Sequence, residues 1–171
     1  MSGQKDLITG LLLSDREDEH VRQAVEKLLL ERGFSPEQIM VDARRTLETQ
    51  AGPLSVRADL LLRVENRAAL VLRCAPGSLV TREKEAVATA RLIVEPWAPW
   101  AAVVNGEDAE LLDTATGKVL AQGLLAIPSP VELSRRLASC PPHRPANQEL
   151  EKAARVYRAF SSLTCPSECV T

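Results

Sequence analysis

One aspartate, Asp59, is the residue of this chain best placed to bind a metal ion. It follows Arg57 by two residues in a segment that alternates between apolar and polar residues, so the two side chains share a face of a β-strand. A carboxylate there can hold a hard cation such as Mg²⁺, or it can be a solvent-facing residue that pairs with Arg57 or Arg73 across the sheet. Both interpretations stay open, and we favour the ion pair.

Further carboxylates would be needed for a metal site, because Mg²⁺ is usually shared among several oxygen ligands. Asp18 and Glu19 lie near the start of the first predicted helix, and Glu65 lies in the turn after the Asp59 strand. Acids are also favoured at any helix N-terminus because they interact well with the helix dipole. We expect Asp18 and Glu19 to be helix-terminal residues, with a metal ligand as the alternative.

Four cysteines raise the question of thiol chemistry or zinc: Cys74, Cys140, Cys165 and Cys169. Cys74 lies in an apolar segment and is interpreted as a small core residue. The other three, with His143, are residue types that bind zinc, but two prolines separate Cys140 from His143. We expect unpaired thiols and no bound metal, with a zinc site or a disulfide as alternatives, in a reducing cytoplasmic protein.

The C-terminal region is locally basic. Its candidates for phosphate contact are Arg135, Arg136, Lys152, Arg155 and Arg158. These side chains could bind duplex DNA weakly, or they could form a solvated helical face. The low aromatic content of 3% leaves few rings on which single-stranded bases could stack.

The elements that must position these residues follow from periodicity. A capping pattern at Ser14 and Glu17, with apolar residues at helical spacing and Gly33 after them, predicts a helix at about 15–32. Before it, Leu7 and Leu12 belong to a short amphipathic segment that we expect to form a helical turn or two. Ser35 and Pro36 predict one further turn.

The middle of the chain predicts a sheet. Strands are expected at about 39–49, 54–64 and 68–74, then a helix at 82–95, a strand at 100–104 and short strands at 110–113 and 118–120. Two further helices are expected at about 130–139 and 147–162. This order predicts an α/β fold, with a mixed β-sheet flanked by helices in a domain of residues 1–127 and a proline-punctuated helical extension at 128–171.

Several local motifs, taken in order, resemble the N-terminal nuclease domain of type I restriction enzyme R subunits, particularly stand-alone bacterial relatives, within the restriction-endonuclease-like or PD-(D/E)XK superfamily. The resemblance covers about residues 15–122. The matching motifs are Val21-Arg22-Gln23 after Asp18-Glu19, Arg57-Ala58-Asp59, Ala75-Pro76-Gly77 and Val103-Val104-Asn105-Gly106.

The resemblance implies a metal-dependent nuclease site with an aspartate at Asp59 and a Glu-x-Lys motif on the next strand. Counting back from Ala75, the glutamate and lysine positions are Leu72 and Cys74. Leucine has no lone pair for a cation, and a neutral thiol is a poor substitute for ammonium. We therefore predict an inactive nuclease-fold protein that acts as a binding or interaction module. The alternative is an active Mg²⁺-dependent endonuclease that uses displaced residues.

Composition limits the partners. The formal net charge is -2 with an isoelectric point near 5.8, whereas dedicated nucleic-acid binders usually carry a basic excess. No apolar run approaches the roughly 20 residues needed to cross a bilayer. We expect protein partners or weak contact with duplex DNA, and no membrane insertion. The sequence does not specify an oligomeric state.

Overall fold

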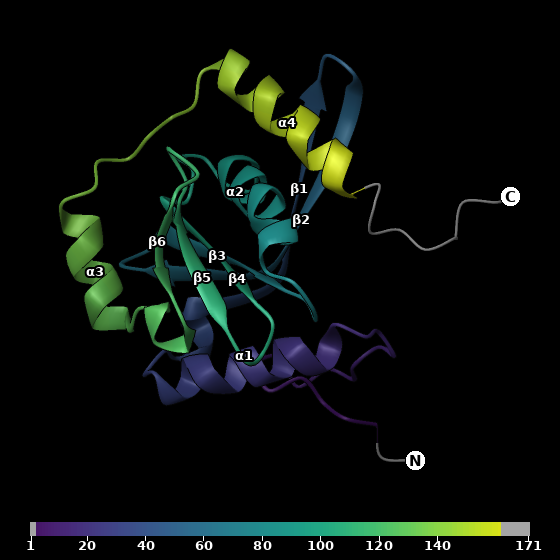
Figure 1. The fold of residues 1–171 in the computed structure, drawn as a ribbon, viewed down its shortest axis with the longest axis vertical. Helices are drawn as coiled ribbons and strands as arrows, with labels where there is room; N and C mark the ends of the chain where they lie inside the picture. Colours follow the sequence, from purple (N-terminus) through teal and green to yellow (C-terminus); the bar gives the residue numbers. More distant parts are fainter. Residues whose placement is uncertain (1–2, 162–171) are drawn as a thin grey trace, which may run out of the picture.

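Six strands form one mixed sheet in the order β1-β2-β3-β4-β5-β6 in the computed structural model, which describes residues 3–161 (Figure 1). The strands are β1 (Ile39–Thr49), β2 (Gly52–Val64), β3 (Arg67–Cys74), β4 (Trp100–Val104), β5 (Ala109–Asp113) and β6 (Val119–Gln122). All neighbours are antiparallel except β3 and β4, which run parallel. A parallel pair needs a crossover connection, and α2 supplies it.

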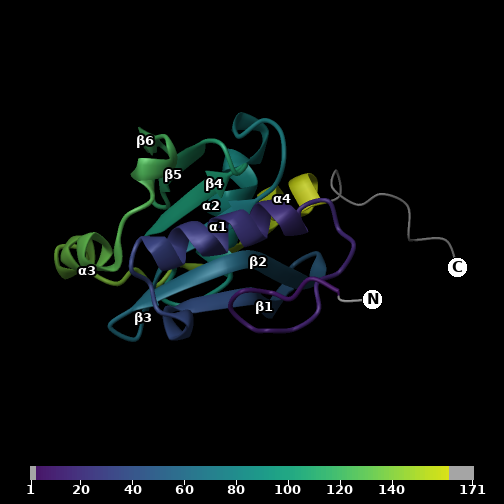
Figure 2. The same ribbon diagram turned by 90° about the horizontal axis from the view of Figure 1, so that it is seen from below.

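Helices cover both faces of the sheet. They are α1 (Glu19–Glu31), α2 (Glu83–Leu92), α3 (Pro130–Ala138) and α4 (Asn147–Ser161), with short 3₁₀ helices at Pro36–Gln38, Val80–Arg82 and Leu124–Ala126. The helix α1 lies on one face, and α2 and α4 lie on the other (Figures 1 and 2). The predicted mixed α/β architecture is therefore confirmed. None of the helices in residues 3–161 is long and apolar enough to span a bilayer.

The strand β3 lies between two hydrophobic cores. Leu70, Leu72 and Cys74 pack with α1, whereas Val71 packs with α2 and α4. This explains why the segment is nearly continuously apolar, since neither face of a strand covered on both sides is exposed to solvent. The direction of each β3 side chain also determines which of them can contact Asp59.

The β2–β3 hairpin depends on an unusual backbone at its tip. Glu65 and Asn66 have φ angles of 51° and 59°, in the left-handed region. Two-residue hairpin turns of this kind match the twist of the flanking strands, and asparagine tolerates the left-handed conformation well. The turn starts the antiparallel pairing of β2 and β3, and a register shift between Leu62 and Arg63 then sets Asp59 opposite Arg73.

The N-terminal region departs from one prediction and agrees with another. The first helix begins at Glu19 rather than at residue 15, because the Ser14 hydroxyl donates to the Glu19 carboxylate at 3.1 Å instead of capping a helix at residue 15. Residues 7–9 form one turn, in which the Gly10 amide donates to the Asp6 carbonyl at 2.9 Å as in an α-helical turn, and a bridge between Lys5 and Leu12 closes the segment. The Asp6 carboxylate caps this turn by accepting the backbone amides of Ile8 and Thr9 at 2.9 and 2.7 Å.

The two C-terminal helices pack into the cores of the sheet. Leu133 and Leu137 of α3 join the α1 core, whereas Ala153 and Ala154 of α4 join the α2 core. The buried Tyr157 of α4 accepts a hydrogen bond at its hydroxyl from the backbone amide of Arg57 at 3.1 Å. The helix α4 thus contacts β2 two residues from Asp59.

Candidate functional site

Asp59 is buried where β2 and β3 lie side by side, with 1% of its surface exposed. One carboxylate oxygen accepts from Arg73 Nη1 at 2.7 Å and from the Cys74 backbone amide at 2.8 Å. The other oxygen lies 3.2 Å from Arg57 Nη2. The predicted ion pair of Asp59 with Arg57 or Arg73 is confirmed with both partners. The expectation that Asp59 faces solvent was wrong, because its carboxylate is enclosed by its β3 contacts and is buried.

The ion pairs continue on both sides of Asp59. Arg57 Nε donates to the Asp42 carboxylate of β1 at 2.6 Å, and Arg73 Nε lies 3.4 Å from the Glu85 carboxylate of α2. The result is a row of alternating charges from β1 to α2, which we call the Asp59 network: Asp42, Arg57, Asp59, Arg73 and Glu85. Each guanidinium lies between two carboxylates, so the buried charges compensate one another.

Burial and the neighbouring carboxylates shift the pKa of Arg73 in opposite directions. Burial alone would lower the pKa of Arg73, but the Asp59 and Glu85 carboxylates outweigh it and raise the pKa above its ordinary value. Burial also raises the pKa of the Cys74 thiol, and the nearby Asp59 carboxylate adds to that effect. At neutral pH the site therefore holds a charged guanidinium beside an uncharged thiol.

The strand register places the expected positions on β3 relative to Asp59. Leu60 pairs with Leu72, so the residue opposite Asp59 is Arg73. Leu72 and Cys74 point into the α1 core on the other face and are fully buried there. Because side chains alternate along β3, Val71 and Arg73 point away from the α1 core that contains Leu72 and Cys74. Neither pair of positions supplies a carboxylate.

The residues present do not fit a divalent cation at Asp59. Both carboxylate oxygens already face guanidinium nitrogens, and one also accepts a backbone amide. The Arg73 guanidinium lies between Asp59 and Glu85, where a cation shared by two carboxylates would have to lie. Within residues 3–161, no group of three or more metal-ligating side chains has the geometry to hold an ion. Glu65 accepts from the Ser134 hydroxyl at the far end of β2 and does not join Asp59.

The first-helix acids have different partners. Asp18 lies 3.5 Å from Arg16, and its carboxylate also contributes to the raised pKa of Arg73. Glu19 pairs instead with Arg22 on the same helix. Of the two predicted acids, only Asp18 is within electrostatic reach of the Asp59 network.

Arg22 forms the centre of a second buried cluster, which the sequence analysis missed. Its Nη1 lies 2.9 Å from Asp6 and 3.2 Å from Glu26, while the Gln23 amide donates to both of these carboxylates. Burial raises the pKa of Glu26 to about 7, and the Asp6 carboxylate adds to this effect despite the opposing Arg22. The cluster fastens the N-terminal segment to α1.

A pair of carboxylates lies farther along the sheet. Glu110 of β5 is opposite Val103 of β4, which is opposite Arg73, so Glu110 lies on the same face as Arg73. Burial and the nearby Glu110 raise the pKa of Glu83 at the start of α2. The Gln122 amide donates to Glu110 at 3.2 Å. Sequence alternation could have placed Glu110 on this face, but its contact with Glu83 depends on the fold.

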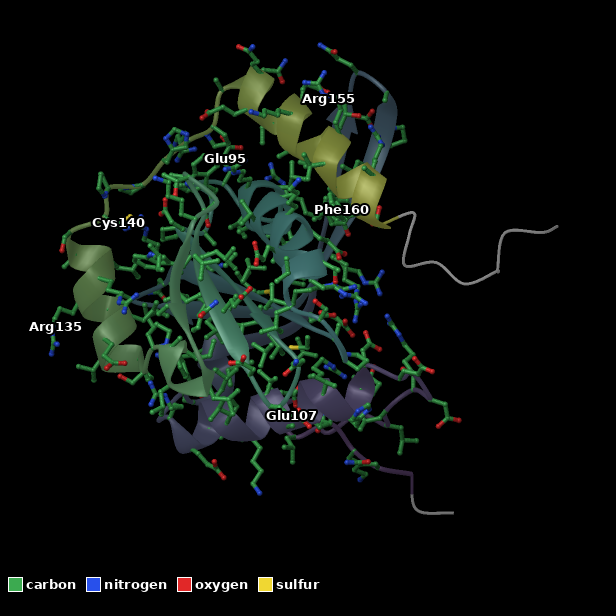
Figure 3. All side chains as sticks on the ribbon, in the orientation of Figure 1. Glu95, Glu107, Arg135, Cys140, Arg155 and Phe160 are labelled. Carbon is green, nitrogen blue, oxygen red and sulfur yellow. The ribbon has the colours of Figure 1, made fainter. Side chains whose placement is uncertain are left out.

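The predicted basic residues do not form one continuous surface. Arg135 and Arg136 lie on α3, whereas Lys152 and Arg155 lie on α4, on a different side of the molecule (Figure 3). Arg158 holds the β1–β2 hairpin, because it donates to the Thr49 hydroxyl at 2.9 Å and to the Gly52 carbonyl at 3.0 Å.

The predicted zinc-type residues are only partly described. Cys140 is a half-buried free thiol. The His143 ring packs on Trp97 with centroids 4.2 Å apart, and its Nε2 lies 3.1 Å from Glu149. Cys165 and Cys169 lie outside the described residues.

Comparison with known proteins gives one match. The model of a family described as the type I restriction enzyme R protein N terminus matches residues 17–128, more than half of the chain. Searches of curated proteins and of solved structures returned no match.

Proposed function

The chain belongs to the type I restriction enzyme R protein N-terminal family, and from this premise we propose that it is a nuclease-fold module that binds a partner and does not cut DNA. The observation that carries the proposal is the Arg73 guanidinium between the Asp59 and Glu85 carboxylates. A nuclease of this kind needs a cation at the Asp59 carboxylate, and here the Arg73 guanidinium provides the positive charge at that carboxylate.

The chemistry of β3 supports the same conclusion. Arg73 contacts Asp59 and Val71 belongs to the α2 core, while Leu72 and Cys74 belong to the α1 core. None of the four offers an oxygen ligand for Mg²⁺, which binds almost only oxygen. No water-activating step can therefore be assigned to this strand.

The binding role follows from what the fold retains. An Asp59 network in which each guanidinium lies between two carboxylates keeps β2, β3 and α2 in fixed positions and leaves the surface of the fold for contacts with other molecules. We place the protein in the cytoplasm, in a process linked to DNA restriction, with a protein or duplex DNA as its partner.

A cleavage assay tests the proposal. Purified protein is incubated with supercoiled plasmid, linear duplex and single-stranded DNA in Mg²⁺ and separately in Mn²⁺. We expect no product above a protein-free control. The Asp59→Asn variant is run in parallel, because a contaminating nuclease would cut equally in both preparations. Metal-dependent nicking that is lost in Asp59→Asn alone would overturn the proposal.

A further inference from the structure

A pocket lined by arginines lies at the C-terminal end of β2, beyond Asp59 in the middle of the strand. It has a volume of about 490 Å³ and is bounded by the β2–β3 hairpin and the segment after α2. Arg45 of β1, Arg63 of β2 and Arg67 of β3 line it. Arg63 follows Asp59 by four residues on one strand, so the two sites are roughly 13 Å apart at 3.3 Å per residue.

Backbone carbonyl groups orient the three guanidinium groups. Arg45 Nη1 donates to the Leu92 carbonyl at 2.9 Å, and Arg67 Nη1 donates to the Cys140 carbonyl at 2.7 Å. Arg63 Nη2 donates to the Asn66 carbonyl at 3.0 Å. A guanidinium carries five N–H donors, so these bonds fix each group and leave further donors to face the pocket. The arginines are thus positioned in advance for a ligand.

The charge in this pocket is unbalanced. Glu95 is the only carboxylate among the lining residues, and Arg45 Nη2 lies 3.5 Å from it. A further arginine, Arg144, approaches the same carboxylate at 4.0 Å. Glu95 lies beside the linker between α3 and α4 (Figure 3). This local positive excess contrasts with the Asp59 network, where each guanidinium lies between two acids, and with the net charge of -2.

The remaining wall is apolar. Ala68, Ile93, Val94 and Pro96 line the side of the pocket next to α2. A volume of this size suits a small molecule, since ligand pockets usually measure roughly 300–1,000 Å³. The pocket therefore combines anion recognition with a surface for a ring or an alkyl group.

We propose that this pocket binds a small phosphate monoester, with the phosphate held by Arg45, Arg63 and Arg67 and its organic group against Ile93 and Val94. Arginine suits phosphate because its planar fork donates two parallel hydrogen bonds to two oxygens. A doubly charged phosphate also offsets the positive excess better than a carboxylate would. This inference is independent of the proposed absence of cleavage.

Isothermal titration calorimetry with the full chain tests the pocket, using inorganic phosphate, phenyl phosphate and uncharged benzyl alcohol at constant ionic strength. We expect phenyl phosphate to bind more tightly than inorganic phosphate and benzyl alcohol not to bind. The Arg63→Gln variant should weaken phenyl phosphate binding about tenfold or more, as expected for the loss of a hydrogen bond to a charged group. Its thermal unfolding is measured first to establish that it folds.

Arg44→Gln is the matched control, because Arg44 is an exposed arginine on β1 outside the pocket. Its affinity for phenyl phosphate should stay within twofold of the unmodified protein. Equal loss in both variants, or no binding of either phosphate, would overturn the proposal. A duplex DNA that binds more tightly than phenyl phosphate and depends on Arg63 would also overturn it, because the pocket would then contact a nucleic-acid backbone.

Discussion

Replacing Asp59 with asparagine should destabilise the protein, because the change removes the central negative charge of the Asp59 network and keeps the side-chain shape. Arg57 and Arg73 would each lose a carboxylate that is 1% exposed, at 3.2 and 2.7 Å respectively. Arg57 would keep Asp42 and Arg73 would keep Glu85. The amide oxygen of asparagine could still accept the backbone amide of Cys74.

The magnitude follows from these remaining partners. Breaking a buried ion pair by removing one partner typically costs about 3–5 kcal/mol. Since both arginines keep one acid, we expect the lower end, about 3 kcal/mol. With a urea dependence of about 2 kcal/mol per molar, the midpoint of unfolding should fall by about 1.5 M.

Urea unfolding in EDTA, followed by circular dichroism, measures this shift. The control is Asp42→Asn, which removes a charge at the outer end of the same network where the side chain is 39% exposed. It should cost about 0–1 kcal/mol, as exposed ion pairs do. An unchanged or higher midpoint for Asp59→Asn would refute the reasoning, because acids gathered for a metal ion repel one another without it, and removing one charge then stabilises the fold.

Three further predictions concern other parts of the chain. The pKa of Glu26 is raised to about 7 in the folded protein, so folding takes up a proton at this carboxyl group. The protonated Glu26 therefore contributes its full stabilisation below about pH 4.5, and this stabilisation is lost as the pH rises to about 7. Glu26→Gln should therefore gain up to about 3 kcal/mol relative to the unmodified protein between pH 5 and pH 8, and urea unfolding curves that shift in parallel at the two pH values would contradict this. A chain that keeps Cys74 as its only cysteine should not react with a thiol reagent until it is unfolded, because the thiol is fully buried and its pKa is raised; rapid native-state labelling would contradict this placement. Fluorescence anisotropy should show duplex DNA binding with a Kd no tighter than about 10⁻⁵ M at physiological salt, weakening as salt rises; tight or sequence-selective binding would identify a dedicated DNA-recognition protein instead.

The sheet could be predicted from sequence because its signals are local. The alternation of β2 and the continuous apolar character of β3 each depend on neighbouring residues, and so does the turn at Glu65 and Asn66. The helix at 130–139 was likewise predicted almost to the residue, since Ser129 and Pro130 mark its start. These local patterns predict the observed strands and helix because the tertiary packing favours the same secondary structure as the local sequence does.

The site was harder to predict because it depends on register. Counting back from Ala75 gave Leu72 and Cys74 as the motif positions, whereas the β3 side chain that contacts Asp59 is Arg73 between them, and one residue along a strand moves a side chain to the opposite face. The contact of Glu85 with Arg73 spans a helix–sheet interface that no local pattern specifies. The Arg22 cluster was missed for a similar reason, since Asp6 reaches it from a segment expected to be helical.

Titration of Mn²⁺ into the metal-free protein tests most directly whether Arg73 has replaced the metal ion at Asp59. Because both carboxylate oxygens of Asp59 face arginines, we predict no stoichiometric binding at Mn²⁺ concentrations up to about 1 mM. A Kd of about 1 mM corresponds to a binding free energy of about 4 kcal/mol. Binding of one Mn²⁺ per chain that disappears in Asp59→Asn and persists in Asp42→Asn would contradict the account.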